Sequence, residues 1–295
     1  MSHSKCFYRV RPLGVKLHFT LYTKTMVNIT YIFVLLISIV FALVHRTLSA
    51  MKRQAMWKGP QLDPHEKPER LPVGVKYEKL DTVIGTSHLA LYLPAEPQKL
   101  KKWIVYTHGI MHHCENMLRI FDDLHDTANV VMWDYRGFGR STGEADRKIS
   151  IYDLYAVLHY VRTEYEIEEV ILMGSSLGSN VVLHFLDTFK GRCKYVSSVI
   201  LCHPFYSLRN VFEHIGAPGT LAYILGNMDV REALPEWLRL DTKRKALVIG
   251  SSEDTITPWE EIRDDAHQIT CVDVGGAHFQ FNELLLREIH KWCTE

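Results

Sequence analysis

The strongest constraint on the fold of this chain is a series of short apolar runs that begins at residue 75 and continues almost to the C-terminus. The runs read VKYEKL, HLALYLP, KWIVYTHG, NVVMWD, EEVILMG, SVILCHP, KALVIGS and ITCVDVG. Strands that are apolar nearly throughout and separated by helices predict a mostly parallel sheet with both faces covered. Because such sheets bind ligands at the carboxyl ends of their strands, functional residues are expected directly after each run.

Three of the intervening stretches have apolar residues at helical spacing. The first begins at Ser150, with Asp153 three residues later as in a helix N-terminus. The other two each present a stripe of large apolar side chains, namely Leu177, Val181, Phe185 and Phe189 in one and Phe281, Leu285, Ile289 and Trp292 in the other. Strands and helices in alternation predict an α/β domain.

Length and composition limit the possible functions. With 295 residues, of which 47% are hydrophobic and 23% charged, the chain suits one catalytic-sized domain plus appendages. Lys and Arg together number 34, as do Asp and Glu, and the basic residues are scattered, so we do not expect a nucleic-acid partner. The 6 cysteines form no Cys-x-x-Cys pair, which excludes a zinc ribbon and a thioredoxin-type motif. The oligomeric state is left open.

Residues 27–44 carry no charged side chain. This length is at the lower limit for a helix that crosses a hydrocarbon core of about 30 Å. We therefore expect a basic N-terminal segment at 1–26, a transmembrane helix or signal anchor at 27–44, a Pro-rich linker at 45–74 and a folded domain at 75–295. A single-pass protein of the endoplasmic reticulum or another endomembrane follows, with the bilayer as partner. Its orientation stays open because basic residues flank the run on both sides. A cleaved signal peptide and a buried core helix are the alternatives.

The fifth apolar run is followed by Gly174-Ser175-Ser176-Leu177-Gly178 and then by a helical stripe. A strand, a tight glycine-flanked turn and a helix are the context in which a central serine is presented above a sheet as a nucleophile. Ser176 is therefore the candidate nucleophile. The alternative is a tight turn in which the glycines serve packing alone.

A serine nucleophile needs a base and an acid that orients the base. Asp254 follows the run KALVIGS, and His278 follows ITCVDV in a glycine-rich loop before the last helix. The chain order Ser176, Asp254, His278 is the order found in α/β-hydrolases. We therefore expect these three residues at one edge of the sheet, with Glu253 as the second choice for the acid.

Hydrolysis through a serine also needs amide donors for the oxyanion. We expect the backbone N–H of Leu177, at the start of the elbow helix, and that of Ile110, in the loop after KWIVYT. His108 in the same loop reads as structural. His112-His113-Cys114 lacks a second ligand pair, so neither a metal nor a cofactor is expected.

The HG loop, DYRGFGRS, GSSLGS, the SSED turn and the GGAHF turn, in this order, resemble the ABHD type of α/β-hydrolase, which includes membrane-associated lysophospholipid lipases and protein depalmitoylases. The resemblance spans residue 75 to the C-terminus. It implies an α/β-hydrolase fold, with Ser176 as nucleophile, Asp254 and His278 as its partners, and Ile110 and Leu177 as oxyanion donors. Many relatives have Asn at the position of Ile110.

The segment 204–245 reads as a small cap insertion rich in aromatic and aliphatic residues. Such a cap suits an acyl chain, so a lipid or acylated substrate is expected. The leading hypothesis is hydrolysis of lysophospholipid or monoacylglycerol esters through an acyl-serine intermediate. The alternatives are a protein S-acyl thioesterase and, less favoured, a catalytically inactive hydrolase-fold scaffold.

Overall fold

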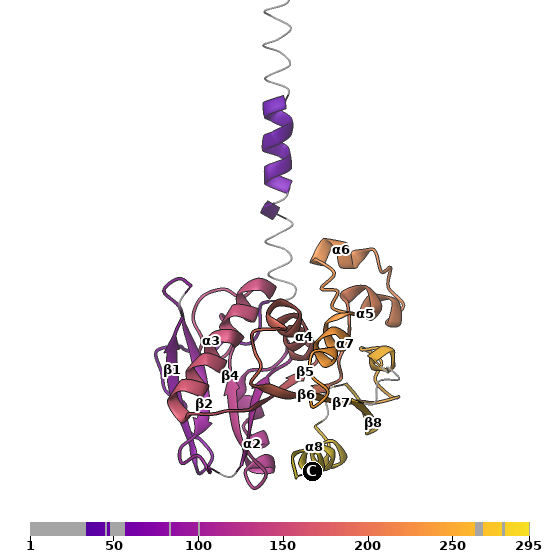
Figure 1. Cartoon of the computed structure of the whole chain (residues 1–295). Helices are drawn as coiled ribbons and strands as arrows, with labels where there is room; N and C mark the ends of the chain where they lie inside the picture. The colour runs from indigo at the N-terminus through magenta and orange to yellow at the C-terminus, as the bar shows by residue number, and fades with distance from the viewer. Residues whose placement is uncertain are drawn as a thin grey trace, which may run out of the picture. The chain divides into compact units, whose positions relative to one another are not determined.

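The computed structural model describes residues 34–44, 46–47, 57–82, 84–99, 101–262, 268–278 and 281–294. The chain divides into two units, Met1–Ala50 and Met51–Glu295, and each is described by itself. In the first unit, residues 34–44 form a helix (Figure 1).

The prediction of a single-pass membrane protein is wrong. Within the ranges just given, every helix is too short or too polar to span a bilayer. An uncharged run indicates hydropathy alone, whereas spanning requires a long apolar helix, and the described residues contain none. The assignment to the endoplasmic reticulum or another endomembrane rested on that helix and falls with it. Residues 1–26, and residues 27–33 of the predicted span, lie outside the described residues.

The second unit is built on a mostly parallel sheet (Figure 1). Its strand order is β1-β2-β4-β3-β5-β6-β7-β8. β2 pairs in antiparallel fashion with β1 and β4, and all other neighbours are parallel. The strands are β1 (Val75–Asp81), β2 (His88–Pro94), β3 (Lys102–Thr107), β4 (Ala128–Trp133), β5 (Val170–Ser175), β6 (Val196–Cys202), β7 (Lys245–Gly250) and β8 (Ile269–Asp273). The predicted α/β-hydrolase architecture is confirmed.

Helices cover both faces of the sheet (Figure 1). α3 (Arg147–Tyr165), α4 (Leu177–Phe189) and α7 (Ala233–Arg239) pack on one face, and α2 (Arg119–Leu124) and α8 (Glu283–Thr294) pack on the other. The remaining short helices are η1 (Cys114–Met117), α5 (Leu208–His214), α6 (Leu221–Leu225) and η2 (Trp259–Ile262). The predicted apolar stripe on α4 is buried along its whole length against the sheet. Because helices cover both faces of the sheet in this way, the central strands are apolar on both faces.

The start of α3 differs from the prediction. The helix begins at Arg147, and the side chain of Asp146 accepts a hydrogen bond from Ile149 N (2.8 Å) as its N-cap. Asp153, which the sequence pattern assigns to the cap, is buried and receives two hydrogen bonds from the guanidinium of Arg136, each of 2.8 Å. The short carboxylate of Asp146 satisfies the first-turn amide, which frees Asp153 for the core.

The strand register aligns the carboxyl ends of the central strands. Thr107 of β3 pairs with Gly174 of β5, and Ser175 of β5 pairs with Cys202 of β6. Gly250 of β7 pairs with Asp273 of β8. The loops that follow β3, β5, β6, β7 and β8 therefore meet at one edge of the sheet, where the candidate site lies.

Candidate active site

Ser176 occupies a sharp turn between β5 and α4. Its backbone has φ 52° and ψ −116°, a conformation that side chains rarely adopt. The turn is closed on both sides by glycines. A Cβ on Gly174 would lie 2.6 Å from the backbone of Gly178, and a Cβ on Gly178 would lie 1.9 Å from Thr107 O. Both glycines are therefore required by close backbone packing, and the strained serine projects at the carboxyl edge of the sheet.

Ser176, His278 and Asp254 form one hydrogen-bonded line. Ser176 Oγ donates to His278 Nε2 (2.8 Å), and His278 Nδ1 donates to Asp254 Oδ2 (2.7 Å). All three side chains are buried. The structure thus brings together residues that lie as far as 102 positions apart in the sequence. Glu253, the second choice for the acid, is exposed and does not enter this line.

The carboxylate of Asp254 accepts several further hydrogen bonds. Ile256 N and Thr257 N donate to Oδ1 (2.8 and 3.0 Å), and the Thr257 hydroxyl donates to Oδ2 (2.6 Å). Burial by itself raises the pKa of this carboxyl, but the hydrogen bonds from His203, His278 and Thr257 outweigh burial and hold its pKa well below its usual range. Asp254 therefore remains ionised and keeps the proton of His278 on Nδ1.

The N–H groups of Leu177 and Ile110, which the sequence predicts as oxyanion donors, belong to the two segments next to Ser176. The N–H of Leu177 belongs to the first turn of α4, where amides have no partner within the helix. The loop after β3 approaches from the other side, since a Cβ on Gly109 would lie 3.5 Å from Ser176 Cβ. Ile110 follows Gly109 directly, and no partner for its N–H occurs among the described residues.

The loop after β3 is held by a buried polar pair. The ring of His108 is inaccessible to solvent, and burial lowers its pKa to about 3. Asp134 Oδ1 accepts a hydrogen bond from Cys114 N (2.7 Å) and lies 3.5 Å from His108 Nε2. Burial raises the pKa of Asp134 to about 6. These contacts fix the loop that carries Gly109 and Ile110, in keeping with a structural role for His108.

His203, Asp254 and His278 have ligand atoms within 4.8 Å of one another, a spacing that suits a metal site. Both imidazoles, however, already place Nδ1 at hydrogen-bonding distance from Asp254 Oδ2, at 3.0 Å and 2.7 Å. Two ligands of a tetrahedral ion at about 2.0 Å would lie more than 3 Å apart. The distances therefore fit hydrogen bonds from both histidines to Asp254 better than a metal site.

Sequence reasoning missed His203 and Thr257 as parts of this network. His203 follows β6 with no glycine motif around it, and Thr257 lies in the turn after the predicted acid. The only available signal was position, because His203 lies at the end of the apolar run SVILCHP.

The insertion after β6 contains α5, α6 and α7. Phe205, Tyr206 and Trp237 are buried within the domain, whereas Ile215 and Tyr223 are exposed. Asn180 Nδ2 of α4 donates to Met228 O (3.1 Å), and His214 Nε2 of α5 donates to Asp254 O (3.1 Å). The insertion is thus attached both to the helix behind Ser176 and to the loop that carries Asp254.

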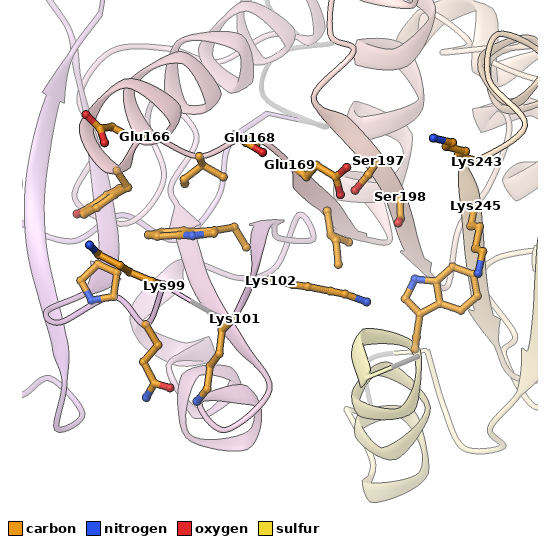
Figure 2. Close-up of a pocket in the computed structure, with 17 residues that line it drawn as sticks. Lys99, Lys101, Lys102, Glu166, Glu168, Glu169, Ser197, Ser198, Lys243 and Lys245 are labelled. Carbon is orange, nitrogen blue, oxygen red and sulfur yellow. The ribbon is translucent and has the colours of Figure 1, made fainter.

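A cavity of about 920 Å³ lies at the other end of the sheet (Figure 2). Lys102 and Lys245 in its wall are the first residues of β3 and β7, whereas Ser176 follows the last residue of β5. Charged side chains of both signs line it, including Lys99, Lys101, Lys243, Glu166, Glu168 and Glu169. This cavity is therefore separate from the Ser176 site.

Residues 98–256 match the model of a hydrolase family described as "Serine aminopeptidase, S33". The match covers more than half of the chain. The chain belongs to this hydrolase family. Ser176 and Asp254 lie within the matched segment of the serine aminopeptidase family, and His278 lies beyond its end.

Known relatives share parts of the chain. An uncharacterised protein of Acanthamoeba polyphaga mimivirus is 29% identical over 173 residues, which cover 54% of this chain and 58% of that protein. Human protein ABHD12B is 29% identical over 134 residues, which cover 41% of this chain and 36% of ABHD12B. A similar segment of a Saccharomyces cerevisiae protein, named an uncharacterised membrane protein, is 28% identical over 156 residues, which cover 48% of this chain and 50% of that protein. The chain thus matches only about half the length of most of these relatives.

Solved structures show the same fold. An esterase of Pyrococcus furiosus superposes with a TM-score of 0.62 at 17% sequence identity, covering 81% of this chain and 95% of the esterase. An α/β-hydrolase from Vibrio vulnificus gives a TM-score of 0.62 at 16% identity, covering 75% of this chain and 81% of the hydrolase. These likenesses show the α/β-hydrolase fold, in agreement with the hydrolase family to which the chain belongs.

Proposed function

We propose that the protein hydrolyses carboxylic esters, with Ser176 as nucleophile, His278 as general base and Asp254 as the acid that orients the base. The observation that carries this proposal is the continuous line of hydrogen bonds from Ser176 Oγ through the His278 ring to Asp254 Oδ2. A serine hydroxyl is a weak nucleophile near neutral pH and reacts when an adjacent base removes its proton.

In the first half of the proposed reaction, Ser176 Oγ attacks the carbonyl carbon of the ester and its proton passes to His278 Nε2. The N–H groups of Ile110 and Leu177 stabilise the negative charge on the carbonyl oxygen. His278 then gives the proton to the alcohol oxygen as the ester C–O bond breaks. The acyl group remains on Ser176.

In the second half, water attacks the acyl carbon and gives its proton to His278 Nε2. The same two amides stabilise the second oxyanion. When the bond to Ser176 Oγ breaks, His278 returns the proton to the serine, which restores the enzyme and releases the carboxylic acid.

We propose acyl esters of lipids, of the lysophospholipid or monoacylglycerol kind, as the substrate class. Large apolar side chains are exposed on the insertion and on the loop after β3, namely Ile215, Leu221, Tyr223 and Met111. A long acyl chain gains about 0.8 kcal/mol for each methylene that such surfaces remove from water. The resemblance to ABHD-type hydrolases supports the same class.

Fluorophosphonate labelling tests the proposed nucleophile. These probes phosphonylate an activated serine, so the wild type is expected to become labelled and Ser176→Ala to remain unlabelled. Ser175→Ala is the matched control, because it removes the neighbouring hydroxyl of the same turn and leaves the Ser176 contacts in place. Equal labelling of Ser176→Ala and wild type would rule out the assignment, and an unlabelled wild type would favour an inactive scaffold.

A substrate panel tests the proposed class. It contains a monoacylglycerol, a lysophosphatidylcholine, an S-palmitoylated peptide and an aminoacyl anilide. We expect kcat/KM for the lipid esters to exceed that for the other two by at least about tenfold, or roughly 1.4 kcal/mol of transition-state stabilisation. Preference for the S-palmitoylated peptide would indicate a protein S-acyl thioesterase, and preference for the anilide an aminopeptidase.

A further inference from the structure

His203 is a buried histidine that directly follows β6 at the carboxyl edge of the sheet. It is 2% exposed, and its φ of 48° lies in the left-handed region, which non-glycine residues seldom occupy. Its backbone N–H donates to Ile249 O of β7 (2.7 Å), which fixes this conformation. A strained backbone that is held by the neighbouring strand aims the imidazole in one direction.

That direction is toward Asp254. His203 Nδ1 lies 3.0 Å from Asp254 Oδ2, the same oxygen that accepts from His278 Nδ1 and from the Thr257 hydroxyl. Because an ionised carboxylate can only accept, His203 Nδ1 must carry a proton. The rings of His203 and His278 meet edge to face, with centroids 5.4 Å apart.

Asp254 Oδ2 accepts hydrogen bonds from three donors, namely His203, His278 and Thr257, and each of them interacts with part of its negative charge. Each hydrogen bond that Oδ2 accepts reduces the negative charge that acts on the proton of His278, and it also restricts rotation of the carboxylate. His203 makes no contact with Ser176 among the described hydrogen bonds. Its effect on Ser176 therefore passes through Asp254.

We propose that His203 is a positioning residue for the ester hydrolysis proposed above: it fixes the Asp254 carboxylate and limits how strongly that carboxylate stabilises protonated His278. The inference rests on the proposed function. Two other histidines belong to the surroundings of this group. Burial, followed by the charges of His113 and His278, lowers the pKa of His112 in the loop after β3, and His214 of α5 donates to the main-chain oxygen of Asp254.

Two substitutions separate hydrogen bonding from packing. His203→Asn keeps an N–H donor at the place of Nδ1 without a titrating ring, and His203→Leu keeps apolar volume without a donor. With an ester substrate, kcat is measured as a function of pH. Without the hydrogen bond from His203, Asp254 should stabilise protonated His278 more strongly, so in His203→Leu the fall of kcat on the acidic side should move to higher pH by about half a pH unit or more. We also expect kcat of His203→Leu to fall about tenfold at its optimum, with KM unchanged. His203→Asn should keep the pH dependence of the wild type.

The outcomes are distinct from failure of the proposed function. If wild type is not labelled on Ser176 by a fluorophosphonate, the ester hydrolysis fails. If wild type is labelled but His203→Leu keeps its pH profile, or His203→Asn behaves like His203→Leu, the positioning role alone is overturned. NMR of wild type with isotope-labelled histidine provides a test that needs no variant to fold. It should show that His203 carries a proton on Nδ1, and an Nε2–H tautomer without that proton would overturn the proposal.

Discussion

Gly178 links the serine turn to the loop that carries the proposed oxyanion donor, so adding one methyl group there tests the geometry of the site. A Cβ at this position would lie 1.9 Å from Thr107 O and 2.8 Å from His108 O. Both contacts are with backbone atoms, which cannot rotate away as the end of a flexible side chain can. Gly178→Ala must therefore push α4 and the end of β3 apart.

The size of the effect follows from the distance. To reach an ordinary van der Waals separation, the backbone of Thr107 must retreat by about 1.5 Å, which is large for a close-packed interior. Overpacking of this kind costs roughly 3 kcal/mol of unfolding free energy. A displacement of about 1 Å in a catalytic arrangement can reduce the rate about 100-fold. We expect Gly178→Ala to show both losses.

Urea denaturation and the rate of fluorophosphonate labelling measure these two effects on the same preparations. Gly191→Ala is the matched control, since a Cβ at Gly191 meets nothing within 4 Å. It should leave stability within about 0.5 kcal/mol of wild type and the labelling rate unchanged. A Gly178→Ala variant that labels at the wild-type rate would refute the close approach of α4 to the loop after β3.

Two further predictions concern buried ionisable groups. Burial, assisted by the charge of Arg147, lowers the pKa of His184 in α4 to about 3. The unfolded chain takes up this proton near pH 6.5 and the folded protein does not, so the stability contributed by neutral His184 is complete above pH 6.5 and is lost as the pH falls toward 3. Keeping His184 neutral in the folded protein should therefore lower the unfolding free energy by about 2 kcal/mol at pH 5 relative to pH 7.5. His184→Gln should reduce the difference in unfolding free energy between these two pH values by that amount, and an unchanged difference would contradict the burial argument. Asp153→Ala should destabilise the protein by about 3–5 kcal/mol in urea denaturation, because it leaves the guanidinium of Arg136 buried without its partner. Glu213→Ala, which breaks an exposed pair with Arg209, should cost less than about 0.5 kcal/mol, and equal effects of the two substitutions would show that burial does not decide the cost.

The sequence predicts the position of Ser176, Asp254 and His278 because each follows an apolar run. In a parallel sheet, the ends of such runs come to one edge, so order along the chain translates into proximity. The glycines at 174 and 178 add a local signal, since the backbone packs too closely at both positions to admit a Cβ. For these three residues, the apolar run before each one predicts a strand, and the parallel arrangement of the strands is enough to bring them together.

The sequence does not predict His203, since its role depends on features that no local pattern encodes. It reaches Asp254 only because β6 and β7 are neighbours and because its backbone adopts a left-handed conformation held by Ile249. The strand order, in which β4 lies between β2 and β3, is likewise set by packing of the whole domain.

Trapping the acyl-enzyme tests the central claim most directly. The protein is mixed with an activated ester, quenched in acid within the first turnovers, digested and analysed by mass spectrometry. The account predicts that the acyl group is found on Ser176 and on no other residue, and that it disappears in Ser176→Ala together with ester hydrolysis. Turnover that continues in Ser176→Ala, or an acyl group carried by another residue, would contradict it.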